Sequence, residues 1–195
     1  MLRRSLGPAD LRRVMRGGAG NSTAMTASQP SAAASPRAPE RRPASGLVLP
    51  GMLLGVGLGG FFDGIVLHQI LQWHHMLTSH GDYPATTVAG LEVNTLWDGL
   101  FHASTYIFTL AGLFVLVSRV KEGLAWSKRM LAGLVLAGWG TFNLLEGVVD
   151  HHILGVHHVK AGMPSLDIAF LAVGAVLLLG GLVLARRGER EADSA

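Results

Sequence analysis

The chain has 195 residues, of which 49% are hydrophobic and only 15% are charged. Such a chain is too apolar for an ordinary soluble domain, so an integral membrane protein is the first interpretation. The net charge of +3 comes from Lys and Arg residues that lie outside the apolar stretches and are not gathered on one face. Their distribution therefore argues against nucleic-acid binding. The absence of Cys excludes disulfides and thiolate metal ligands.

The apolar stretches predict an all-α membrane protein. Residues 1–46 are rich in Ala, Ser, Pro and Arg and predict a disordered cytoplasmic tail. Residues 47–187 predict a four-helix membrane domain, because four stretches approach the roughly twenty apolar residues that cross a bilayer. Residues 188–195 predict a short cytoplasmic tail. The predicted transmembrane helices cover about residues 47–76, 95–118, 129–152 and 167–186.

The positions of the basic residues predict the orientation. Eight Lys and Arg precede the first apolar stretch, and four lie between the second and third stretches. Three more stand at or just after the end of the fourth stretch. Only Lys160 lies in the other two loops. We expect a protein of the inner membrane, and by the positive-inside rule both of its termini are expected in the cytoplasm. All nine His residues then lie toward the outer face.

An internal repeat connects two His-containing segments, residues 62–76 and 145–159, at an offset of 83 positions. A weaker match between residues 96–103 and 165–172 extends it. Each copy contains two predicted helices, so we predict a four-transmembrane-helix bundle of two parallel two-helix repeats, related by a pseudo-two-fold axis along the membrane normal. The aligned pairs are Asp63 with Glu146, Gly64 with Gly147, His68 with His151, His74 with His157, and His75 with His158.

The residues shared by the two copies are those that bind metals. Helical bundles build metal sites from carboxylates and imidazoles that project inward from several helices. An ionisable residue within a membrane span costs about 2.5 to 3.5 kcal/mol at its centre, which favours a functional role. Nitrogen and oxygen donors without thiolate suit Cu(II), Zn, Fe or Mn. The candidate ligands are Asp63, His68, Asp98, His102, Glu146, Asp150 and His151, with His74, His75, His157 and His158 as possible outer ligands.

Other interpretations of these residues stay open. If the first helix extends to residue 76, Asp63 and His74 share one of its sides, while His68 and His75 share another. The paired His residues at the helix ends can instead be surface groups. Asp98 and His102 stand one turn apart and can satisfy each other by hydrogen bonding. His80 and Asp167 are interpreted as structural, the latter as a helix start.

Three segments carry a family resemblance: residues 61–75, 94–103 and 143–158. They resemble a bacterial family of predicted membrane proteins known as domain of unknown function 2243. The resemblance covers about residues 46–186 and implies a four-span inner-membrane protein with no established activity. It also implies an association with cytochrome oxidase assembly factors, and so with copper or haem handling.

Four functions are compatible with this sequence. The leading hypothesis is metal handling, of copper or a similar ion, linked to respiratory oxidase maturation. The second is a metal-dependent hydrolase or oxidase for a lipid-soluble substrate, with Glu146 as general base. The third is a b-type haem held by His68 and His151. The fourth is a structural membrane subunit without cofactor. The expected partners are the lipid bilayer, oxidase assembly proteins and a second copy of the chain.

Overall fold

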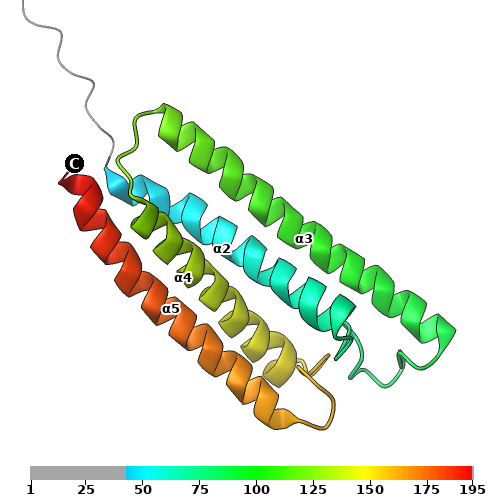
Figure 1. The fold of residues 1–195 in the computed structure, drawn as a ribbon. Helices are drawn as coiled ribbons and strands as arrows, with labels where there is room; N and C mark the ends of the chain where they lie inside the picture. The colour runs from blue at the N-terminus through cyan, green and yellow to red at the C-terminus, as the bar shows by residue number, and fades with distance from the viewer. Residues whose placement is uncertain (1–42, 195) are drawn as a thin grey trace, which may run out of the picture. The chain divides into compact units, whose positions relative to one another are not determined.

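Among the residues that the structure describes, four helices are long and apolar enough to cross a membrane. The computed structural model describes residues 43–194, and these contain no β-strand. The tail predicted for residues 1–46 lies outside the described residues up to position 42. In chain order the elements are η1 (Ala44–Leu47), α2 (Val48–Phe62), η2 (Asp63–Ile70), α3 (Val88–Lys121), α4 (Lys128–Glu146), η3 (Gly147–Ile153) and α5 (Pro164–Asp193) (Figure 1).

Polar caps fix where the second and third long helices begin. The Thr87 side chain accepts a hydrogen bond from the backbone N–H of Gly90 at 3.1 Å, and α3 begins at the next residue. Ser127 caps α4 in the same way, accepting from Met130 N at 3.1 Å. Both caps satisfy an N–H group that has no partner inside the helix. As a result α3 starts seven residues before the predicted boundary at residue 95.

The helix ends also differ from the predicted boundaries. The first membrane-spanning segment ends at Ile70 instead of about residue 76, and Gln72 follows with a positive φ of 48°. A helix cannot continue through a left-handed residue, so the chain turns away there. At the other end of the protein, α5 continues to Asp193, through most of the segment predicted as a tail.

Glycines let the helices pack closely. In Figure 1, α2 and α4 lie side by side, with α3 along α2 and α5 along α4. A Cβ atom on Gly55 of α2 would lie 2.2 Å from the carbonyl oxygen of Val135 in α4. A Cβ atom on Gly133 of α4 would lie 2.3 Å from the backbone nitrogen of Ala185 in α5. Such close backbone approach is how helices associate in lipid.

The close contact at Gly55 yields a testable prediction. Gly55→Ala is expected to lower the stability of the detergent-solubilised protein by about 1 to 3 kcal/mol, because the added methyl group has no space. Gly180→Ala is the matched control, since nothing lies within 4 Å of the corresponding methyl position. Thermal unfolding followed by size-exclusion chromatography measures both variants. Equal melting temperatures for the two variants would contradict the packing of α2 on α4.

Candidate metal centre

The two central helices both change from α to π geometry at the same end of the bundle. The π-helix η2 continues α2 and η3 continues α4. Their i to i−5 hydrogen bonds are closed by Leu71 N to Val66 O and by Leu154 N to Val149 O, both at 2.8 Å. π-helical turns are rare and often occur at functional sites. Here they carry four of the seven main candidate ligands predicted from the sequence, Asp63, His68, Asp150 and His151.

The chain turns back sharply after each π-helix. Gln72 and Gly155 have positive φ values of 48° and 57°. These turns return His74 and His157 to the interior of the bundle, where their exposed fractions are 2% and 0%. The helical-wheel expectation for His74 and His75 therefore does not apply, because neither residue is helical.

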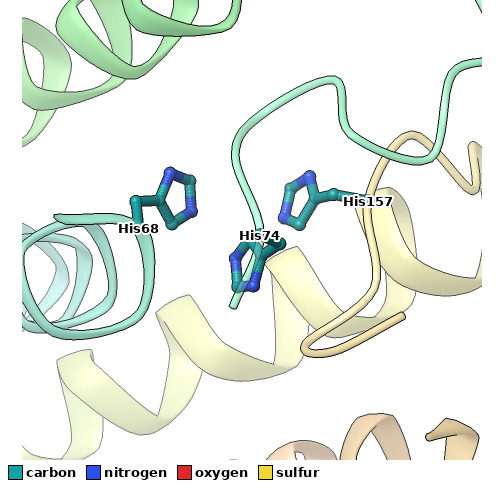
Figure 2. A group of neighbouring side chains, drawn as sticks. All are labelled: His68, His74 and His157. Carbon is teal, nitrogen blue, oxygen red and sulfur yellow. The ribbon is translucent and has the colours of Figure 1, made fainter. Parts of the chain in front are cut away.

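Four imidazoles meet in the interior. The ring centroids of His68 and His74 are 4.3 Å apart, and those of His74 and His157 are 4.9 Å apart with the rings stacked. The ring of His151 lies 4.9 Å from that of His157. Figure 2 shows that His68, His74 and His157 project from separate segments of the chain toward one another. Two residues expected at most as outer ligands, His74 and His157, thus lie at the centre of the cluster.

Six side chains from this cluster have the spacing of metal ligands. Each is at most 5% exposed. The six residues form three overlapping groups of three. Within each group, one ligand atom from each residue lies within 4.8 Å of the ligand atoms of the other two. The groups are His68 with His74 and His157, Glu146 with His151 and His157, and Asp63 with His68 and Glu146.

The donor atoms of these six residues lack hydrogen-bond partners. Among residues 43–194, nine buried side-chain nitrogen and oxygen atoms make no hydrogen bond, and all nine belong to the six residues. Folded proteins normally satisfy such atoms, because each one left without a partner costs about 1 to 3 kcal/mol. A bound cation would satisfy several of them at once.

Hydrogen bonds at the far side of two rings define which nitrogen is free. His68 Nδ1 donates to Asp98 Oδ1 at 2.9 Å, and His74 Nδ1 donates to the carbonyl oxygen of Val159 at 2.8 Å. In a neutral ring the lone pair then lies on Nε2. His68 Nε2 faces Asp63 Oδ2 at 3.1 Å, within ion-pair distance but without hydrogen-bond geometry. Two such acceptors are stable together only with a cation between them, either a metal ion or a proton on the ring.

His74 and His157, the two of the four clustered imidazoles that lie outside the helices, stay neutral at physiological pH. Burial lowers the pKa of His74 to about 4, and the nearby His68 ring adds to the shift. Burial lowers the pKa of His157 to about 2, with His74 and His151 contributing. The neutral ring is the form that binds metals. Both side chains therefore hold a lone pair ready at pH 7.

Asp98 supports the cluster from behind. Its carboxylate accepts hydrogen bonds from His68 Nδ1, from His75 Nδ1 at 2.6 Å and from the backbone N–H of Met76 at 2.9 Å. A carboxylate that holds the second nitrogen of a metal-binding imidazole fixes the orientation and tautomer of the ring. Asp98, predicted as a ligand, is thus placed behind His68 rather than in any of the three groups.

Asp167 makes the same contacts in the other half of the bundle. Its carboxylate accepts from His158 Nδ1 at 2.9 Å and from Val159 N at 2.8 Å, and it lies 3.4 Å from His151 Nδ1. The sequence reasoning treated Asp167 as structural and so missed it as a support of the cluster. The signal was present, since the weak repeat match aligns Asp167 with Asp98.

The other predicted residues lie outside the three groups. His102 donates from Nδ1 to the backbone carbonyl oxygen of Asp98 at 2.8 Å. Asp150 is half-buried and follows Glu146 by one turn. His75 is held by Asp98, and His158, which is held by Asp167, is 44% exposed. None of these four residues belongs to the three groups.

The support by Asp98 yields a second prediction. Asp98→Asn is expected to weaken metal affinity by about 10-fold to 100-fold, the usual effect of losing a carboxylate that orients a ligand. Asp82→Asn is the control, because the Asp82 side chain is 78% exposed and lies beside His80. Competition with a chromophoric chelator measures both affinities. An Asp98→Asn protein with wild-type affinity would remove Asp98 from the support of the centre.

A pocket of about 660 Å³ opens beside the cluster. Its wall includes His68 and His74 from the six donors, together with Asp98 and His75. Gln72 and Trp73, from the turn after η2, form another part of the wall. A small molecule in this pocket therefore lies beside two of the six donor residues, whose Nε2 atoms are themselves buried.

The family model described as "Predicted membrane protein (DUF2243)" matches residues 50–188. This range includes all six donors and both supporting carboxylates. No curated protein and no solved structure matches the chain significantly. Because the matched range covers well over half of the chain, the protein belongs to this family of predicted membrane proteins, DUF2243.

Proposed function

We propose that the protein is a membrane metalloprotein that binds transition metal within the cluster of six buried donor residues at one end of the helix bundle. The observation that carries the proposal is the set of nine buried donor atoms without hydrogen-bond partners, all within one cluster. A structural role alone does not account for so many unsatisfied atoms in one place, because each is a cost to stability.

The donor chemistry narrows the choice of metal. Four imidazoles and two carboxylates, with no thiolate in the chain, suit Zn, Fe, Mn or Cu(II). Copper(I) prefers sulfur donors, and none of the six donors is a sulfur atom.

The pocket favours chemistry on a small molecule, as in a metal-dependent enzyme. His68 and His74 form part of the pocket wall, so a reactant in the pocket lies beside two of the metal-binding residues. Gln72 also lines the pocket and keeps a left-handed backbone, which costs a non-glycine residue about 1 to 2 kcal/mol. Gly155, the residue 83 positions later, has the same conformation without that cost. Strain that is kept at a cavity wall favours a functional side chain.

Within this proposal Glu146 acts as a ligand. Both of its carboxylate oxygens are buried without hydrogen-bond partners, and it belongs to two of the three groups. A general base needs a free oxygen facing the reactant, and Glu146 does not line the pocket. The hydrolase or oxidase chemistry considered from the sequence therefore needs another proton acceptor. His75 lies on the pocket wall and meets that geometric requirement.

A second candidate is copper handling linked to oxidase maturation. The His158 side chain favours it, because it is 44% exposed and lines the pocket that leads to His74. A metal ion arriving from solvent could pass from His158 to the buried donors. The rate at which bound metal passes to a chelator separates the two functions. A metal-handling protein gives up its metal within minutes, while a metal-dependent enzyme retains it.

The haem and structural alternatives have less support. His74 and His157 each lie close to both His68 and His151, with ring centroids 4.3 to 6.3 Å apart. These rings fill the space that a porphyrin between His68 and His151 requires. A structural subunit needs none of the six donors.

Orientation and duplication complete the proposal. The Lys and Arg distribution supports cytoplasmic termini in an inner membrane, with the cluster at the outer face. The same contacts recur in the two halves of the sequence, with the His residues 83 positions apart and the Asp residues 69 positions apart, which supports two parallel repeats: Asp98 and Asp167 each bind a His ring and the backbone N–H of the residue that follows that His.

Purified protein tests the proposal directly. Elemental analysis after dialysis in mild detergent is expected to give a stoichiometric transition metal, and the visible spectrum is expected to lack a Soret band. A Soret band would select the haem alternative. Protein that retains none of Zn, Fe, Mn or Cu after incubation with each would contradict the proposal.

A further inference from the structure

We infer that the centre holds two metal ions bridged by Glu146, one beside the pocket and one deeper in the protein. This inference rests on the proposed function and adds the number and arrangement of the ions. It starts from the way in which the six donors divide.

The six donors do not converge on one point. They form three overlapping groups of three, and no larger group satisfies the 4.8 Å spacing. Ligand atoms bound to one transition metal at about 2.0 to 2.2 Å lie within about 4.4 Å of each other. The whole set therefore exceeds what one ion can bind with the side chains placed as they are.

Glu146 is the only residue shared by the two groups that contain carboxylates. One group joins it to Asp63 and His68, and the other joins it to His151 and His157. Both carboxylate oxygens of Glu146 are free of hydrogen bonds. One of these oxygens, Oε1, lies 3.5 Å from His157 Nε2 of the second group. Carboxylates commonly join two metal ions about 3.5 to 4 Å apart.

His74 completes the arrangement. It belongs to the third group, together with His68 from one carboxylate-containing group and His157 from the other. Its Nε2 atom is buried and has no hydrogen-bond partner. This nitrogen is available to the ion beside the pocket, because His74 and His68 both form part of the pocket wall.

The two positions differ in their relation to the pocket. His68 and His74 line the pocket, whereas His151, His157 and Glu146 do not. The first ion therefore lies beside the pocket, and the second lies deeper in the protein. The deeper ion can hold the shared carboxylate in place and adjust the charge at the ion beside the pocket.

Titration with Mn²⁺ tests the inference. Metal-depleted wild-type protein is expected to bind two equivalents of Mn²⁺, with an electron paramagnetic resonance signal broadened by coupling between two close ions. Glu146→Gln is expected to bind at most one equivalent and to lose the coupling. Asp150→Asn is the matched control, because Asp150 is a half-buried carboxylate one turn away and outside the three groups.

The outcomes separate this inference from the proposed function. One equivalent in the wild type, with an uncoupled signal, would overturn the pair of ions and leave the metalloprotein intact. No binding of Mn²⁺, Zn²⁺, Fe²⁺ or Cu²⁺ would overturn both. Asp63→Asn provides a second variant if Glu146→Gln does not fold. It is expected to retain only the deeper ion, so two coupled ions in this variant would contradict the assignment of Asp63.

Discussion

Replacing His157 with Asn is expected to remove at least half of the metal that the wild-type protein retains through dialysis. His157 belongs to two of the three donor groups and is fully buried, so no neighbouring water can take its place without rearrangement. Loss of a ligand weakens binding by more than the roughly 10-fold to 100-fold that loss of an orienting partner costs. Elemental analysis of the purified variant measures the effect.

Two further variants make the result at His157 specific. His80→Asn is the control, because the His80 side chain is 50% exposed and lies outside the cluster. The double variant His68→Asn with His157→Asn removes a donor from every group and is expected to retain no metal. Each variant is first checked for a monodisperse size-exclusion peak. Full metal content in a well-folded double variant would contradict the cluster as the site of binding.

Removing the metal is expected to lower the melting temperature of the protein by about 5 to 10 °C. A ligand at 100 times its dissociation constant stabilises the folded state by about 2.7 kcal/mol. For a chain of this size, each kcal/mol corresponds to about 2 to 4 °C. Without metal, the buried carboxylates and imidazoles are left unsatisfied in the interior. Thermal unfolding before and after chelation, followed by re-addition of the metal, measures the shift.

The double variant again provides the comparison for this stability effect. It lacks a donor in every group, so a chelator is expected to leave its melting temperature unchanged. A chelator-induced shift of equal size in this variant would assign the effect to metal bound elsewhere. If chelation leaves the melting temperature of metal-loaded wild-type protein unchanged, the cluster is satisfied by protons and not by a metal ion.

The membrane fold was predictable because it follows from composition and from the lengths of the apolar stretches. An apolar stretch long enough to cross the bilayer must satisfy its backbone internally, and this dictates helices. The four helices long enough to span a membrane confirm this prediction. Their ends were less predictable, because caps such as Thr87 and left-handed residues such as Gln72 depend on local geometry.

The cluster was predictable in composition but not in layout. Pairing of His68 with His151 and of Asp63 with Glu146 was visible in the aligned segments. The central positions of His74 and His157 were not, because they depend on π-helical turns and on the sharp return of the chain after each turn. A helical wheel assumes 100° per residue, and it gives wrong directions for side chains beyond a π-helix.

The supporting carboxylates show why residue type alone was insufficient. Asp167 lies in the first turn of α5, and Asp98 lies three residues after the helix start predicted at residue 95; an acidic residue is common at a helix start for reasons of local structure. Their contacts with His75 and His158 require two distant segments to meet. Only the weak alignment of residues 96–103 with 165–172 connected the two residues before the structure did.

X-ray absorption at the metal edge of the purified protein tests the buried centre most directly. The expected spectrum has nitrogen and oxygen neighbours at about 2.0 to 2.2 Å, with the outer-shell scattering of several imidazole rings. A shell of oxygen neighbours without imidazole scattering, or sulfur neighbours at about 2.3 Å, would contradict a centre built from His68, His74, His151 and His157.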